Sequence, residues 1–214
     1  MVRTHRPDIL VLVETWVTYT RVFPFLQTLG FADGVFVDPI GFSGGIWVVW
    51  KPNIVQVQVL ASSRQYIHMS IHSTADPVWY FTAIYGSPTR ELREHLWNDL
   101  VALESSTHGP WLLAGDFNAI IDPSEREGRP TANTAVSKRF VEVINHCHLL
   151  DLGFSRSQFT FARGSVCKRL DRALCNAAWR NTFDEASVFH LPRTKATYPY
   201  GYLFSGHYAH ELES

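Results

Sequence analysis

The sequence predicts an α/β fold in which two β-sheets pack together and helices cover their outer faces. Short runs rich in Val, Ile, Trp, Tyr and Phe are separated by Gly, Pro or Asn, which is typical of strands joined by turns. Three longer segments carry apolar residues at helical spacing. Many strands with a few interspersed helices favour two packed sheets. A chain of 214 residues that is 46% hydrophobic can bury the core of one good-sized domain.

The apolar runs predict strands at residues 9–13, 34–38, 45–50, 54–60, 66–72, 78–85, 111–115, 157–162 and 187–190. Helices are expected at residues 19–29, 89–104 and 134–148, where apolar residues recur three or four positions apart. The second of these helices has one apolar stripe, formed by Leu92, Leu96, Leu100 and Leu103. The third has a similar stripe, formed by Val136, Phe140, Val143 and Ile144.

Composition excludes several classes of protein. A formal net charge of −1 excludes a globally basic nucleic-acid binder, so affinity for phosphate must come from a local patch or a metal ion. No apolar run approaches the roughly 20 residues that span a membrane, and the N-terminus lacks the apolar region of a signal peptide. We therefore expect a soluble, intracellular protein.

The three cysteines lack the Cys-x-x-Cys spacing of zinc sites and redox motifs, which indicates reduced thiols. Cys147 lies between His146 and His148, a grouping that would suit a metal ion. The simpler interpretation, a half-buried helix face, is favoured.

The most informative motif is WLLAGDFN at residues 111–118, where a buried strand ends in two polar residues. Asp116 and Asn118 are two positions apart, so a strand places them on the same face. A carboxylate there can orient water or bind a cation, and an amide can hydrogen-bond a phosphate oxygen. The same Gly-Asp-x-Asn pattern also forms ordinary Asx-turns, and the motif alone leaves both interpretations open.

Three further segments place polar residues at or within apolar runs. Glu14 ends the run at residues 7–14, and Tyr85 ends the run at residues 81–85. Asp171 lies inside a short apolar stretch and is flanked by Arg169 and Arg172. Taken singly, these residues would also fit a solvated strand end, a packing tyrosine and a surface ion pair.

In order and spacing, these four segments resemble the endonuclease/exonuclease/phosphatase superfamily. The closest resemblance is to the apurinic-type endonuclease domain of plant LINE-type (non-LTR) retrotransposons. Residues 44–50 (GGIWVVW), the pair Glu125 and Gly128, residues 159–161 (FTF) and the spacing from Asp171 to Trp179 also match that subfamily. The resemblance extends from about residue 5 to about residue 193, and it implies a four-layer α/β sandwich.

The resemblance also implies roles for individual residues. Glu14 would bind Mg²⁺ (or Mn²⁺), a hard cation that needs only one or two carboxylates. Asp116 would orient or deprotonate the attacking water, and Asn118 would hydrogen-bond the phosphate. Tyr85 would donate its hydroxyl to a phosphate oxygen. Asp171 would support the active site beside a catalytic His.

Substrate contacts are expected from Thr160, Arg126 and Arg163, with Arg129 as a further loop arginine near the matched motifs. The expected partner is DNA, bound through its backbone, and action on genomic DNA would place the protein in the nucleus. Thr160 would equally serve as strand filler, and each arginine alone fits a solvated surface charge. No small-molecule cofactor or membrane partner is expected, and the oligomeric state is open.

The sequence departs from the family pattern at both ends. The family begins with a strand carrying an Asn, about thirty residues before the metal-binding Glu, whereas Met1 is only thirteen residues before Glu14. The family closes with Ser-Asp-His, but Ala196 and Thr197 stand where that motif is due. We therefore expect a domain at 1–195 without its first and closing strands, followed by a non-family tail at 196–214. Translation of the tail out of frame would explain it.

The predicted function is a divalent-metal-dependent phosphodiester hydrolase, a DNA endonuclease domain of retrotransposon origin with impaired activity. One alternative is a non-catalytic retrotransposon remnant. Another is a phosphatase of the same superfamily, against which the plant LINE-like details argue.

Overall fold

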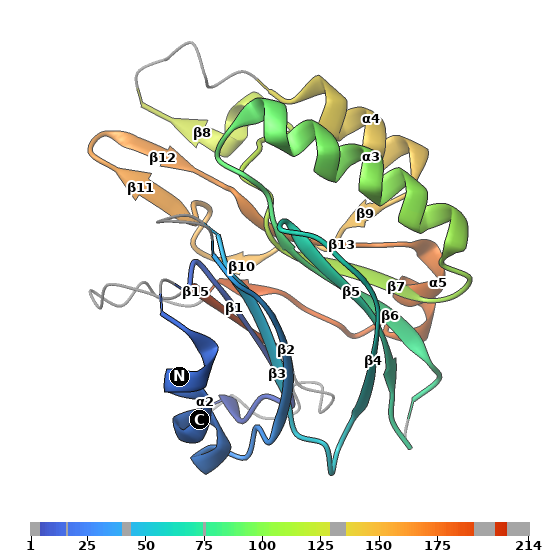
Figure 1. Cartoon of the computed structure of the whole chain (residues 1–214). Coiled ribbons are helices and arrows are strands. Elements are labelled where there is room, and N and C mark those ends of the chain that lie inside the picture. Colours follow the sequence, from blue (N-terminus) through green and yellow to red (C-terminus); the bar gives the residue numbers. More distant parts are fainter. Residues whose placement is uncertain are drawn as a thin grey trace.

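The computed structural model describes residues 5–15, 17–39, 44–74, 76–128 and 136–190, together with the backbone of residues 200–204. Two β-sheets lie face to face, one carrying helix α2 on its outer side and the other carrying helices α3 and α4 (Figure 1). This arrangement of helix, sheet, sheet and helix confirms the predicted four-layer α/β sandwich. No helix in the described part of the chain is long and apolar enough to cross a membrane.

The larger sheet has six strands in the order β4-β5-β6-β7-β13-β9. They are β4 (Gln56–Ser62), β5 (Tyr66–His72), β6 (Trp79–Tyr85), β7 (Trp111–Asp116), β13 (Asp171–Cys175) and β9 (Leu150–Asp151). Only the β6–β7 pair is parallel. Helix α3 (Arg90–Ser106) makes the crossover between these two strands, as a parallel connection requires.

The smaller sheet is antiparallel and has the order β15-β1-β3-β2. Its strands are β15 (Tyr200–Phe204), β1 (Ile9–Val13), β3 (Ile46–Trp50) and β2 (Asp33–Val37). Strand β15 lies within the segment 196–214 that sequence analysis assigns to a non-family tail, and it pairs with β1 along its whole length. An open edge on β1 would leave backbone groups unpaired, and a segment with Tyr, Leu and Phe readily satisfies them.

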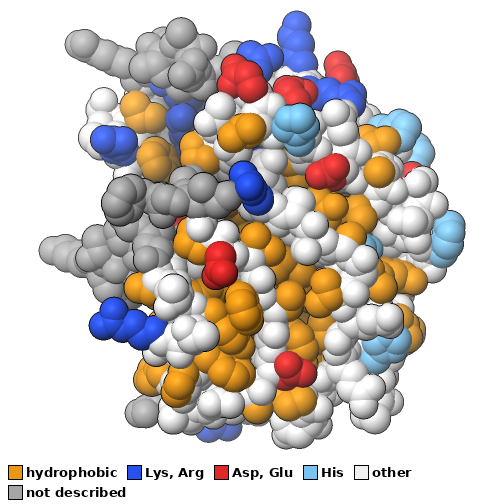
Figure 2. All heavy atoms as spheres, viewed as in Figure 1, with side chains coloured by type: hydrophobic (Ala, Val, Ile, Leu, Met, Phe, Trp, Pro, Cys, Tyr) orange, Lys and Arg blue, Asp and Glu red, His pale blue; other side chains and the backbone are white. Residues whose placement is uncertain are grey.

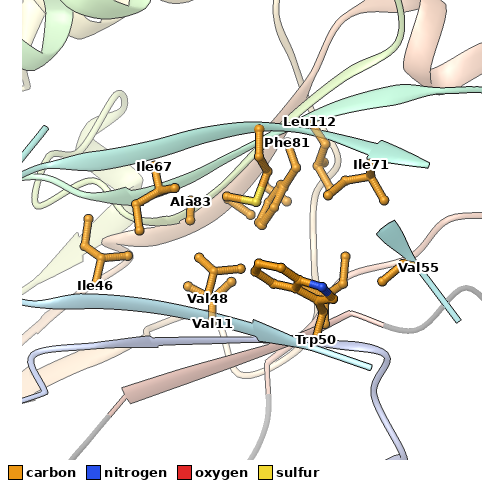
Figure 3. Packing of buried hydrophobic residues seen from close by; sticks show 14 of the residues in the cluster. Val11, Ile46, Val48, Trp50, Val55, Ile67, Ile71, Phe81, Ala83 and Leu112 are labelled. Carbon is orange, nitrogen blue, oxygen red and sulfur yellow. The ribbon is translucent and has the colours of Figure 1, made fainter. Parts of the chain in front are cut away.

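The main core lies between the two sheets (Figure 3). Val11, Val48 and Trp50 point from the smaller sheet toward Ile67 and Phe81 of the larger one. Residues of opposite parity on the same strands face outward, as the strand period of two demands. The outward side chains form a second cluster beneath α3 and α4 (Lys138–His146) and a third beneath α2 (Tyr19–Thr28).

Helices α2 and α3 agree closely with their predicted ranges, whereas α4 begins only at Lys138, so Val136 of the predicted third stripe lies before the helix. The predicted stripe of α3 also has one exception. Leu96, Leu100 and Leu103 are buried in the second cluster, but Leu92 is 52% exposed. The first turn of α3 lies beside polar groups, because the side-chain amide of Gln65 donates to the carbonyl of Leu92.

Smaller elements surround the two sheets. The strand predicted at 157–162 is instead β11 (Phe161–Arg163), which forms a three-stranded sheet with β12 (Val166–Lys168) and β8 (Arg126–Glu127). The predicted strand at 187–190 is reduced to β14 (Phe189–His190), which pairs in parallel with β10 (Ser155–Arg156). A 3₁₀-helix (Pro123–Glu125) precedes β8, and helix α5 (Ala177–Thr182) follows β13.

Candidate active site

Three predicted site residues lie side by side because neighbouring strands of the larger sheet end at the same level. Tyr85 ends β6 in register with Asp116, which ends β7. Asp171 begins the antiparallel strand β13 and is in register with Asp116 from the other side. Ala83 and Ala114, two positions before Tyr85 and Asp116, belong to the core between the sheets. The three polar residues therefore close one end of that core.

Glu14 comes from the other sheet and joins the same group. It follows β1 directly, its amide donates to the carbonyl of Gly45 at 3.1 Å, and its φ of 55° is left-handed. The hydroxyl of Tyr85 donates to Glu14 Oε1 at 2.9 Å. A left-handed glutamate is uncommon and marks a backbone held by its surroundings. This hydrogen bond spans the two sheets, and in the structure it occupies the hydroxyl that sequence analysis assigns to phosphate.

Asp116 and Asn118 form the Asx-turn that sequence analysis keeps as an alternative. Asp116 Oδ1 accepts from the amide of Asn118 at 2.7 Å, and Asn118 is left-handed with a φ of 48°. Asn118 Nδ2 donates to Asp116 Oδ2 at 3.0 Å and to the carbonyl of Gly86 at 2.9 Å. The turn and the convergence of polar residues thus coexist. Here the Asn118 amide orients the Asp116 carboxylate.

Gly115, immediately before Asp116, is required by the close approach of β7 to β6. Its φ is +147°, and a Cβ at this position would lie 2.0 Å from the carbonyl oxygen of Ile84. Any side chain would therefore push the two strands apart. The Gly in the GDFN motif sets the register that brings Asp116 beside Tyr85.

Asp116 carries the clearest electrostatic signature of the site. Its side chain is partly exposed, yet burial of the carboxyl raises its pKa well above the usual 3.8, and the negative charges of Asp171 and Glu14 raise it further. The Asn118 amide and the Arg93 guanidinium act in the opposite direction. Like charges at close range favour the neutral form. The charges of Glu14 and Asp171 thus lie close enough to the Asp116 carboxyl to raise its pKa.

Thr160, which directly precedes strand β11 of the three-stranded sheet, positions Asp171. Its hydroxyl oxygen accepts from the amides of Leu170 and Asp171, both at 3.0 Å. The Leu170 carbonyl in turn accepts from the amide of Phe117, in the loop that follows Asp116. Thr160 therefore fixes the backbone at which β13 begins. Thr160 is therefore more than strand filler, because its hydroxyl holds the backbone beside the acid.

Arg169 and Arg172, which flank Asp171 in sequence, are both buried. Both lie in a buried network with Glu125 and Asp151, at nitrogen–oxygen distances of 2.7–3.2 Å. Glu125 Oε2 also accepts from the amide of Ile121 at 2.8 Å. The network joins β13 to the loop after Asp116. It also accounts for the Glu125 of the matched pair, which is a structural residue.

Gly128, the other member of that pair, is likewise structural. Its φ is +98°, and a Cβ there would lie 2.1 Å from the carbonyl oxygen of Ser165. Because Gly128 has no side chain, the backbone after β8 can pack directly against the turn between β11 and β12.

Basic residues lie near the site on the three-stranded sheet β11-β12-β8 and on helix α3. Burial lowers the pKa of Lys168, and the positive charges of Arg126 and Arg93 lower it further, so these three side chains share one region. Arg93 also donates to the carbonyl oxygens of Ser87 and Pro88. Sequence analysis misses Arg93 and Lys168, because a basic residue on a polar helix or a short strand carries no local signal of function.

The predicted arginine contacts are only partly placed by the structure. Arg126 and Arg163 are expected in loops, but they lie in strands β8 and β11 of the three-stranded sheet. Both residues pair through their backbones with strand β12. Such pairing cannot be recognised in a short polar sequence. Arg129 lies outside the described residues.

The acids fit a divalent cation in one respect. The negative charges of Asp171 and Glu14 act on the Asp116 carboxyl, and a bound cation would offset this repulsion. Within the described ranges, no group of three or more His, Cys, Asp and Glu side chains is arranged to hold a metal ion. Mg²⁺ keeps several waters and needs only one or two carboxylates, so its binding would not require such a group. Cys147 is buried, in agreement with the helix-face interpretation.

Comparison with known proteins identifies the family of the chain. The endonuclease/exonuclease/phosphatase family matches residues 1–193. The chain belongs to this family. No curated protein has a sequence that matches the chain.

Solved structures of the same fold include three informative examples. An endonuclease/exonuclease/phosphatase family protein from Leptotrichia buccalis is 14% identical, with a TM-score of 0.53 over 83% of this chain and 78% of that one. D. rerio TDP2 complexed with single strand DNA product is 10% identical, with a TM-score of 0.50 over 83% and 74%. The endonuclease domain of TRAS1, a telomere-specific non-LTR retrotransposon, is 14% identical, with a TM-score of 0.50 over 67% and 65%. The chain thus spans 65% of the TRAS1 domain's length.

Proposed function

We propose that this chain is a divalent-metal-dependent phosphodiester hydrolase, a DNA endonuclease domain derived from a plant LINE-type retrotransposon. The observation that carries the proposal is the convergence of Glu14, Tyr85, Asp116 and Asp171 at the shared end of two sheets. Membership of the family, and the similarity of the fold to a retrotransposon endonuclease domain, support a nuclease.

The chain's own residues can perform several parts of such a reaction. Asp116 would take a proton from the attacking water, and its raised pKa brings it nearer the working pH, where a general base is most effective. Asn118 would hold that carboxylate in position through its amide group. Tyr85 would hold the Glu14 carboxylate in position through its hydroxyl group. Arg93 and Lys168 would attract the DNA backbone.

A divalent cation, Mg²⁺ or Mn²⁺, would be held by Glu14 with water molecules. When bound, it would neutralise charge on the phosphate oxygens. The side chains named above would supply proton transfer, positioning and attraction of the DNA backbone.

We further propose that the activity is low, because Ala196 and Thr197 stand where the family's Ser-Asp-His motif is due. A general acid or base typically contributes about 10²–10⁴-fold to the rate. The proposal takes residues 1–195 as the family domain and residues 196–214 as a tail of other origin. Its substrate is DNA, so its place of action is the nucleus.

A plasmid-nicking assay on the full chain tests the proposal. We expect slow relaxation of supercoiled plasmid in Mg²⁺ or Mn²⁺, none in EDTA, and a loss of at least about 10²-fold in Asp116→Asn. Asp184→Asn, an exposed acid after α5, is the matched control and should retain the wild-type rate. Equal nicking by wild type and Asp116→Asn would sink the proposed site. No nicking by the wild type at high enzyme concentration would favour the non-catalytic remnant.

A further inference from the structure

Gln65 contacts the segment between β6 and α3 at three points. Its carbonyl oxygen accepts from the amide of Tyr85 at 2.8 Å, and its side-chain oxygen accepts from the amide of Ser87 at 2.7 Å. Its side-chain amide donates to the carbonyl of Leu92, in the first turn of α3, at 2.8 Å. A single glutamine thus binds both ends of the segment that leads from β6 into α3 (Figure 1).

Gln65 is itself held in the tight turn between β4 and β5. The amide of Ser63 donates to the carbonyl of Tyr66 at 2.9 Å, and the amide of Gln65 donates to Ser63 Oγ at 3.1 Å. Tyr66 is buried in the cluster beneath α3 and α4. A side chain on a backbone that is fixed in this way can determine the position of a neighbouring loop.

The same segment contacts the turn formed by Asp116 and Asn118. The amide of Gly86 donates to the carbonyl of Asp116 at 2.7 Å, and the carbonyl of Gly86 accepts from Asn118 Nδ2 at 2.9 Å. A Cβ on Gly86 would lie 2.5 Å from the carbonyl oxygen of Phe117, so the two backbones are in direct contact. Asn118 Nδ2 also donates to Asp116 Oδ2 at 3.0 Å. The Gly86 carbonyl therefore helps to hold the amide group that orients the Asp116 carboxylate.

Three consecutive residues alternate between these two sets of contacts. The amides of Tyr85 and Ser87 bind Gln65, whereas both backbone groups of Gly86, between them, bind the turn. The alternation follows from the sheet, because β6 lies between β5 and β7 and offers its backbone groups to each in turn. A displacement of Ser87 would therefore move Gly86, and with it the acceptor of the Asn118 amide group.

We propose that Gln65 is a positioning residue for hydrolysis. Through Ser87 and Gly86 it fixes the side chain of Asn118, and hence the direction of the Asp116 carboxylate. This inference rests on the proposed function, because it assigns Gln65 to the same site. Gln65 acts in this way through other residues and touches no reacting atom.

Hydrogen exchange measured by NMR on the full chain, free of DNA, tests the positioning without cleavage. Gln65→Met removes both side-chain hydrogen bonds of Gln65, while Arg93 still holds the Ser87 carbonyl. The side-chain amide protons of Asn118 should then exchange about 2- to 10-fold faster than in the wild type, the effect of one weakened hydrogen bond. Met is uncharged like Gln, so the charged side chains that lie over α3 and α4 in Figure 2 act on the site as before.

Two further variants isolate the contact with Ser87. Gln65→Glu keeps an acceptor for the Ser87 amide and should leave the Asn118 exchange rate within about twofold of the wild type. Gln58→Met is the matched control on strand β4 of the same hairpin, where the side chain is exposed, and should change nothing. An unchanged Asn118 rate in Gln65→Met would overturn the inference. Faster exchange throughout the larger sheet would also overturn it, because Gln65 would then stabilise the fold as a whole.

The kinetics of plasmid nicking provide the second readout. Gln65→Met should lower kcat by about 10- to 100-fold, the effect of displacing a reacting group by up to about 1 Å, with KM within about twofold of the wild type. A chain that shows the exchange effect but nicks no plasmid loses the proposed function. A chain that nicks plasmid equally fast with and without Gln65 loses this inference alone.

Discussion

Replacement of Glu125 by Gln removes one charge from a buried network that is balanced in the wild type. The network contains two cations, Arg169 and Arg172, and two anions, Glu125 and Asp151. The Glu125 side chain is 8% exposed, and Arg172 is fully buried. Glu125 accepts hydrogen bonds from Arg169 at 3.0 Å and from Arg172 at 3.0 and 2.8 Å. Glu125→Gln would leave one uncompensated positive charge in the interior.

The expected cost is large. Breaking a buried ion pair from one side typically costs about 3–5 kcal/mol, because the remaining charge is poorly solvated. That is a substantial part of the roughly 5–15 kcal/mol by which domains are stable. For a domain of this size, each kcal/mol lowers Tm by about 2–4 °C, so we expect Tm to fall by roughly 6–20 °C.

Urea unfolding followed by tryptophan fluorescence would measure this difference. Glu142→Gln is a suitable control, because Glu142 pairs with Arg139 on the surface with side chains 64% and 41% exposed. Such exposed pairs contribute about 0–1 kcal/mol. If Glu125→Gln unfolds within about 0.5 kcal/mol of the wild type, the network does not hold β13 and the reasoning fails.

Two further predictions concern the site and the smaller sheet. Asp116→Asn should raise the free energy of unfolding at neutral pH: the folded-state pKa of Asp116 is raised, so its charge destabilises the fold as pH rises through that pKa. The gain should shrink as pH falls toward 3.8 in a series of urea titrations, and a gain that is constant with pH would contradict it. A chain ending at Lys195 should be less stable by a few kcal/mol, at about 0.5–1.5 kcal/mol for each hydrogen bond lost between β1 and β15. Unchanged stability would show that β1 tolerates an open edge.

Local patterns in the sequence predict most of the elements and the individual site residues. Glu14, Tyr85 and Asp116 can each be found as a polar residue that ends an apolar strand, because strand burial is written in neighbouring residues. The layered fold also follows from such patterns and from the family resemblance. Short elements escape them: β13 begins with Asp171 and Arg172, whose charges interrupt its apolar run.

The tertiary structure decides what these residues contact. The register of β6, β7 and β13 places Tyr85, Asp116 and Asp171 in one row, and the Tyr85–Glu14 hydrogen bond joins the two sheets. The ion-pair partners of Arg172 lie 21 and 47 positions away in sequence. The sequence by itself determines which residues are polar at strand ends, since that depends on near neighbours. Which of them share a site depends on strand register, which arises only when distant segments pack against each other.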